Sequence, residues 1–159
     1  MPETTPPVPP NPPVRLHLTT PPLDSAARQG RFGYGDPCPG HAGLAGPATG
    51  DWAGRTLEEV AAEDPQGIRA WLTDPTYAPP GGGESVAALI ARTGAHLAAL
   101  PPGPHDAVVG QAVVRAAVVW ALELPERAFW RLDVRPRTVT TLSGRSGRWN
   151  LLVGRPAGE

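Results

Sequence analysis

The 159-residue chain has one cysteine, no lysine and no long apolar run. The scarcity of cysteine and of apolar runs excludes whole classes of protein. A single cysteine, Cys38, excludes an internal disulfide framework and a cysteine-rich metal site. No apolar run reaches the roughly 18–20 residues that span a bilayer, so we expect no membrane association. The N-terminus also lacks the apolar centre of a signal peptide, and we therefore expect a cytoplasmic protein.

An excess of charge of one sign is missing too. The formal net charge is −1 and the sequence pI is near 6.4, so no strong field attracts nucleic acid. Cys38 and His41 lie close together in a predicted loop, but two ligands do not make a metal site. We expect no nucleic-acid partner, no metal and no cofactor.

Proline and glycine, by contrast, are abundant, with 22 and 19 copies. Prolines crowd residues 1–14, where fixed φ angles and missing N–H donors predict an extended, disordered tail. Hydrophobic residues make up 40% of the chain and include five tryptophans, which is enough to build a core. The length suits one domain, which we place at residues 15–159.

Hydrophobic periodicity predicts a mixed order of strands and helices. Alternation predicts a first strand at residues 15–19, and a 3.6-residue period predicts a long helix over about residues 85–100. Thr56 followed by Glu59 is a capping box, which predicts a helix that ends at Asp64-Pro65. An apolar helix is predicted at residues 111–122, and further strands at residues 106–110, 129–134, 137–142 and 149–153. This order favours an α/β fold with a partly parallel sheet.

Several segments resemble, in the same order, the motifs of the histidine phosphatase superfamily, also called phosphoglycerate-mutase-like. The run from Asp51 to Glu59 resembles its G-x-W-x-G-x-[ST] segment, and the run from Pro79 to Ser85 with Arg92 resembles its P-x-G-G-E-S…R segment. Residues 108–116 resemble its V-[TS]-H-x-x-V-[IV]-R-A strand-to-helix turn. Further similarity covers residues 28–32, 129–134 and 147–151. The nearest look-alikes are short bacterial phosphatases of the cobalamin-pathway type.

The resemblance implies a phosphoglycerate-mutase-like α/β fold, with an open, mainly parallel sheet flanked by helices. It also implies a chemistry in which one histidine attacks phosphorus and a second histidine helps to hold the phosphoryl group. In that chemistry two arginines neutralise the phosphate, and a carboxylic acid delivers the proton.

The positions that the family uses for catalysis carry other residues here. The Arg-His pair after the first strand falls on Thr20 and Pro21, and the second histidine falls on Gly110. The acid falls on Gly46. A βα segment is also expected to be missing between residues 40 and 50, because a βαβ unit takes roughly 30 residues. Since proline and glycine offer neither a ring nitrogen nor a charge, no residue is assigned a catalytic role.

Four residues are the expected remnants of the family's pocket: Arg28, Arg31, Glu84 and Arg115. Arg28 and Arg31 are interpreted either as ligands for an anion or as surface arginines in salt bridges. His17, inside the first predicted strand, is interpreted either as a displaced nucleophile or as an ordinary strand histidine.

These observations predict a degenerate histidine-phosphatase-like protein, a pseudoenzyme that acts as a binding or interaction protein. Two alternatives stay open: an enzyme recruited to different small-molecule chemistry on the same fold, and a divergent phosphomonoesterase. The expected partners are a small anionic ligand and a homo-oligomer or protein partner that covers a sheet edge exposed by the shortening.

Overall fold

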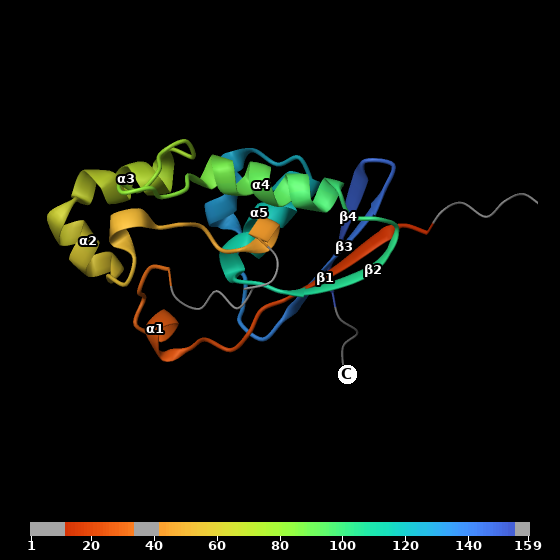
Figure 1. Cartoon of the computed structure of the whole chain (residues 1–159), viewed down its shortest axis with the longest axis horizontal. Helices are drawn as coiled ribbons and strands as arrows, with labels where there is room; N and C mark the ends of the chain where they lie inside the picture. Colours follow the sequence, from red (N-terminus) through yellow and green to blue (C-terminus); the bar gives the residue numbers. More distant parts are fainter. Residues whose placement is uncertain (1–11, 34–41, 155–159) are drawn as a thin grey trace, which may run out of the picture.

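A four-stranded open sheet forms one end of the molecule in the computed structural model, which describes residues 12–33 and 42–154 (Figure 1). Its strands, in spatial order, are β2 (Gly103–Val108), β1 (Val14–Thr19), β3 (Val139–Arg145) and β4 (Arg148–Leu152). β1 and β2 run parallel, whereas β1–β3 and β3–β4 are antiparallel. The expectation of a mainly parallel sheet is therefore wrong. The β3–β4 hairpin turns at Ser146-Gly147, and a tight hairpin can only join antiparallel strands.

In chain order, the helices of the described ranges all come after β1 and before β3. They are α1 (Ser25–Arg28), α2 (Leu57–Glu63), α3 (Pro65–Thr73), α4 (Val86–Ala98) and α5 (Gln111–Ala121), with 3-10 turns η1 (Ala42–Leu44), η2 (Gly50–Trp52) and η3 (Glu126–Arg131). In Figure 1, α2 and α3 lie at the end opposite the sheet, with α4 and α5 between them. No helix in the described ranges has the length and apolar character that crossing a membrane requires.

Local signals account for where several of these helices begin. The capping box is confirmed: the Thr56 hydroxyl accepts from the Glu59 amide, and the Glu59 carboxylate accepts from the Thr56 amide. Asp64 ends α2 and also caps α3, because its carboxylate accepts from the Gly67 amide at 2.9 Å. Ser85 caps α4 in the same way through the Ala88 amide.

The main core lies between α5 and one face of the sheet. Leu16, Leu18 and Leu142 point from the strands into a cluster with Val113 and Ala117 of α5, all of them fully buried. Helix α4 packs on α5 in turn, and a side chain at Gly94 would collide with the Trp120 ring. Burial of these aliphatic faces is the main force that holds the helices to the sheet.

The opposite face of the sheet is open. Val108, Val139 and Leu152 on this face are 46%, 59% and 69% exposed. His17 also lies there, with its Nδ1 3.0 Å from the Thr141 hydroxyl. That a second copy or another protein covers an exposed edge of the sheet stays a prediction.

Two predicted strands differ from the structure. Residues 129–134 do not form a strand: Phe129 and Trp130 lie in η3, which starts after Pro125. Phe129 is buried against α4 and α5 there, so packing overrides the strand preference of its aromatic neighbours. The strand predicted at 106–110 and described as buried is instead β2 at the edge of the sheet, where Ala107 is its buried residue.

Candidate functional site at the carboxyl ends of β1 and β2

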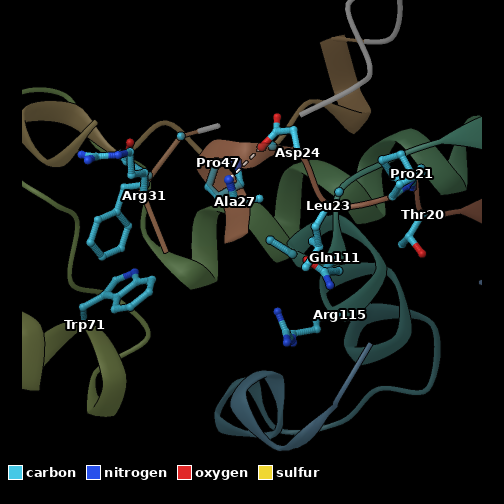
Figure 2. A pocket seen from close by; sticks show the side chains of 17 residues that line it. Thr20, Pro21, Leu23, Asp24, Ala27, Arg31, Pro47, Trp71, Gln111 and Arg115 are labelled. Carbon is cyan, nitrogen blue, oxygen red and sulfur yellow. Dashed lines mark hydrogen bonds between the residues drawn. The ribbon is translucent and has the colours of Figure 1, made fainter. Parts of the chain in front are cut away.

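A cavity of about 290 Å³ lies where the two parallel strands end. Because β1 and β2 run in the same direction, the segments that follow them, Thr20–Asp24 and Gly110–Ala112, reach the same edge of the sheet. The remaining walls come from α1, from residues 31–33, from Gly46, Pro47 and Thr49, and from Trp71 of α3 (Figure 2). Open α/β sheets bind their ligands at this edge.

The cavity brings together the four positions at which the sequence motifs predict that the catalytic residues are replaced. Thr20, Pro21, Gly46 and Gly110 come from three separate parts of the chain, and all four line it. The lining residues within the described ranges include no histidine. His41 and Cys38 lie outside the described residues, and those residues hold no group of three or more His, Cys, Asp or Glu side chains that suits a metal.

Thr20 uses its side chain to hold the backbone rather than to face a ligand. Its buried hydroxyl donates to the Arg135 carbonyl at 2.7 Å and accepts from the Thr138 amide at 3.1 Å. The residue thereby joins the end of β1 to the turn that precedes β3. A hydroxyl engaged in this way has little capacity left for an anion.

Arg115 is the cation whose charged end faces the cavity. It projects from α5, and its guanidinium nitrogens point toward the side of the pocket where Trp71 lies (Figure 2). Its Nε donates to the Leu132 carbonyl at 2.6 Å, and its Cζ lies 5.9 Å from the centre of the Phe129 ring. Among the described residues no other hydrogen-bond acceptor is found for this guanidinium, so its two Nη groups are available to a ligand.

Burial lowers the pKa of Arg115, and the nearby Asp133 carboxylate acts against this by raising it. An arginine titrates so far above neutrality that the side chain stays charged. A charge that is only partly hydrated gains more from an anionic partner than a fully solvated one.

The other predicted remnants are placed differently. Arg31 lines the cavity, but its Nε donates to Gln29 and its Nη1 donates to the Gly54 carbonyl, and in Figure 2 these nitrogens point away from Arg115. Arg28 lies in the last turn of α1 and does not line the cavity. Glu84 lies outside it, in an ion pair with Arg92 at 2.8 Å.

The start of α5 forms part of the same wall. Gly110 is its N-cap and makes no side-chain cap, and the amides of Val113 and Val114 turn back to the Gly110 carbonyl. The first amides of a helix carry partial positive charge. The wall that holds Arg115 therefore presents positive potential to the cavity.

Sequence reasoning missed Trp71 as a pocket residue, because it expected all five tryptophans to pack the core or to cover the sheet. Trp71 lines the cavity and makes edge-to-face contacts with Phe32 at 5.4 Å and Trp130 at 4.5 Å between ring centres. No local motif marks this residue, because a tryptophan on a short helix is as typical of a core as of a pocket.

These features define an α/β protein of phosphoglycerate-mutase-like architecture, with a ligand-sized cavity at the carboxyl ends of its parallel strands. The chain belongs to the histidine phosphatase superfamily (branch 1), whose family model matches residues 28–154. The family predicted from the motifs is thus confirmed, while the loss of its catalytic histidines stays a prediction.

Solved structures agree with this assignment. The fold is similar to the α-ribazole phosphatase of Shigella flexneri, with a TM-score of 0.71 and 16% identity over 87% of this chain and 95% of the other. It is also similar to a mycobacterial glucosyl-3-phosphoglycerate phosphatase solved with VO3, with a TM-score of 0.59 and 32% identity over 71% of this chain. The chain spans 60% of the length of that mycobacterial protein. No curated protein matches the chain in sequence.

Proposed function

We propose that this chain is a binding protein of the histidine phosphatase superfamily, which holds a small anion in the cavity at the strand ends and does not hydrolyse phosphomonoesters. One observation carries the proposal. The cavity that Thr20, Pro21, Gly46 and Gly110 line retains a cation, Arg115, whose Nη groups have no protein acceptor among the described residues.

The argument against hydrolysis rests on the residues at the end of β1. A phosphohistidine route needs an imidazole nitrogen in line with phosphorus, and the Pro21 ring carries no lone pair that could attack. Loss of one member of a catalytic unit can cost about 10⁶ in rate. With the second histidine and the acid also replaced by glycine, we expect no turnover above the uncatalysed rate.

The argument for binding rests on α5. Arg115 and the first amides of α5 lie on one wall, and both favour a negative group. Phosphate and carboxylate both fit this chemistry. A structure of the mycobacterial relative contains inorganic phosphate, which supports phosphate as the first probe.

The alternative of an enzyme recruited to other chemistry requires an acid or a base in the cavity. Glu84, the candidate for that role, has both carboxylate oxygens engaged by Arg92, at 2.8 and 2.9 Å. Asp24 lines the cavity, but one of its oxygens accepts from the Ala27 amide at 2.7 Å as the cap of α1. These pairings favour the binding function.

The test combines calorimetric titration of inorganic phosphate with a panel of phosphomonoesters and a search for acid-labile phosphohistidine. We expect saturable phosphate binding, no turnover and no phosphohistidine. Arg115→Met is expected to weaken the binding at least about tenfold. Turnover that His17→Ala abolishes, or an isolated N–P adduct, would establish the divergent phosphatase instead.

A further inference from the structure

A second cavity, of about 150 Å³, adjoins the first and is lined mainly by aromatic and aliphatic side chains. We call it the annex. Its inner walls include Val86, Leu89, Phe129 and Trp130. The two cavities share Pro47, Trp71, Ala112 and Arg115, so one molecule can reach from the cation into the annex.

We propose that the bound anion carries a single aromatic ring, with the anionic group beside Arg115 and the ring in the annex against the Trp71–Trp130 pair. This inference rests on the anion-binding function proposed above and names the class of ligand for that site.

The volume of the annex sets the size of the apolar group. An apolar cavity of about 150 Å³ stays dry and holds benzene. The annex has this volume, so its space accommodates one six-membered ring. Most of the side chains that line the annex are apolar and offer no hydrogen bonds to the hydroxyl groups of a sugar in the same place.

The walls favour an aromatic ring over a flexible chain. Trp71 and Trp130 meet edge to face at an interplanar angle of 71°, and Phe129 meets Trp130 edge to face at 88°. A third ring placed against such a pair adds the same edge-to-face and offset contacts. Trp71 is held from behind by Phe32 and Trp52, so the wall is formed before a ligand arrives.

The charges that face the annex do not oppose an anionic ligand. Glu84 lines it, but Arg92 neutralises that carboxylate through two hydrogen bonds. Arg115, at the shared wall, is the other charged residue that lines the annex within the described ranges. The mouth between the cavities is therefore positive, and the annex behind it is apolar.

The experiment compares two probes that cannot be hydrolysed, methylphosphonate and phenylphosphonate, by isothermal titration against the full chain. We expect phenylphosphonate to bind at least about tenfold more tightly, because its ring leaves water for an apolar site. Saturation-transfer NMR from the indole protons is expected to reach the probe's ring protons in the unaltered protein.

Three variants locate the ring. Trp130→Leu is expected to bring phenylphosphonate to the affinity of methylphosphonate while leaving methylphosphonate unchanged. Trp130→Phe keeps an aromatic wall and is expected to retain most of the preference. Trp149→Leu is the matched control, since Trp149 packs on Trp120 and lines neither cavity, and it is expected to keep the full preference.

The outcomes separate the two proposals. If both probes bind equally, or if Trp130→Leu folds and leaves the preference intact, the ring assignment is wrong while anion binding stands. If neither probe nor inorganic phosphate binds, the binding function itself is wrong and the ring assignment fails with it. Should Trp130→Leu not fold, the Trp130→Phe titration and the saturation transfer decide the matter.

Discussion

Arg92 on α4 and Arg115 on α5 are half-buried arginines on two helices that pack against each other. Arg92 donates to both oxygens of Glu84 and to the carbonyls of Gly43 and Ala45. Arg115 donates to a single carbonyl, that of Leu132, and turns its remaining nitrogens toward a cavity. The Arg92 guanidinium therefore stabilises the fold, whereas the Arg115 guanidinium is available to a ligand.

The physical basis of this difference is hydrogen-bond satisfaction. A planar guanidinium has five N–H donors, and a buried one is stable only when most of them are matched. Arg92 meets this demand within the protein and thereby clamps residues 43–45 to α4. Arg115 leaves donors without a described protein partner at a place where an anion can supply the acceptors.

Replacement of Arg92 gives the largest expected loss of stability. Arg92→Leu removes the bonds to the 43–45 segment and leaves the Glu84 carboxylate, whose side chain is 17% exposed, without its counter-ion. We expect the free energy of unfolding to fall by about 3 kcal/mol, measured by urea denaturation.

Arg55→Leu provides the control for that measurement. Arg55 pairs with Glu63, whose side chain is 70% exposed, so solvent screens the pair. We expect a change below about 0.5 kcal/mol. Equal losses in the two variants would contradict the structural role of Arg92.

Thr20→Val tests a second polar side chain whose hydrogen bonds are made within the protein. The change removes one of two hydroxyl donors to the Arg135 carbonyl and leaves the Thr138 amide without its bond to the Thr20 hydroxyl. We expect a loss of about 2 kcal/mol in the same assay. A loss within the error of the measurement would show that the turn before β3 does not depend on this hydroxyl.

Arg115→Met is expected to affect binding more than stability. It removes one hydrogen bond to Leu132, which contributes about 1 kcal/mol, but it removes the cation from the cavity. Inorganic phosphate is expected to bind at least about tenfold more weakly in calorimetry, since charge-assisted bonds are the strong ones.

Arg31→Met tests whether anion binding depends on Arg115 in particular or on any positive charge near the cavity. Its guanidinium is engaged by Gln29 and Gly54 and points outward, so phosphate affinity is expected to stay within about twofold. If Arg31→Met weakens binding as much as Arg115→Met does, the assignment of the anion to Arg115 is wrong.

Thr93→Val has the smallest expected effect. Thr93 follows Arg92 on α4 and is fully buried, yet its hydroxyl has no partner in the described part of the chain. An isosteric apolar side chain leaves nothing unsatisfied, so unfolding should change by less than about 0.5 kcal/mol, toward higher stability. A clear destabilisation would reveal a hydrogen bond that this hydroxyl makes.

Local signals made much of the fold predictable. The capping box at Thr56, the stop at Asp64 and the apolar spacing of α4 and α5 depend on residues within a few positions of one another. The hairpin of β3 and β4 was predictable for the same reason. The apolar face of a helix follows directly from its period, so α4 and α5 appeared with bounds within about two residues of the observed ones.

Long-range packing decided the elements that were predicted wrongly. Phe129 and Trp130 form part of a 3-10 turn because Trp71 and the α4–α5 surface lie beside them, and those contacts are distant in sequence. β1 accepts an antiparallel strand on one side and a parallel strand on the other, which its own pattern does not specify.

By itself the sequence determined the family and the order of most elements, and it predicted the replacement of catalytic residues at four positions, because motifs and periodicity are properties of neighbouring residues. Only the tertiary structure decided that those four positions line one cavity, that Arg115 rather than Arg31 turns its charge into it, and that Trp71 and Trp130 form an apolar annex beside it. The direction of a side chain depends on which acceptors lie within reach after folding. Gln29 and Gly54 hold the Arg31 guanidinium outward, whereas the described acceptors leave most of the Arg115 guanidinium unmatched.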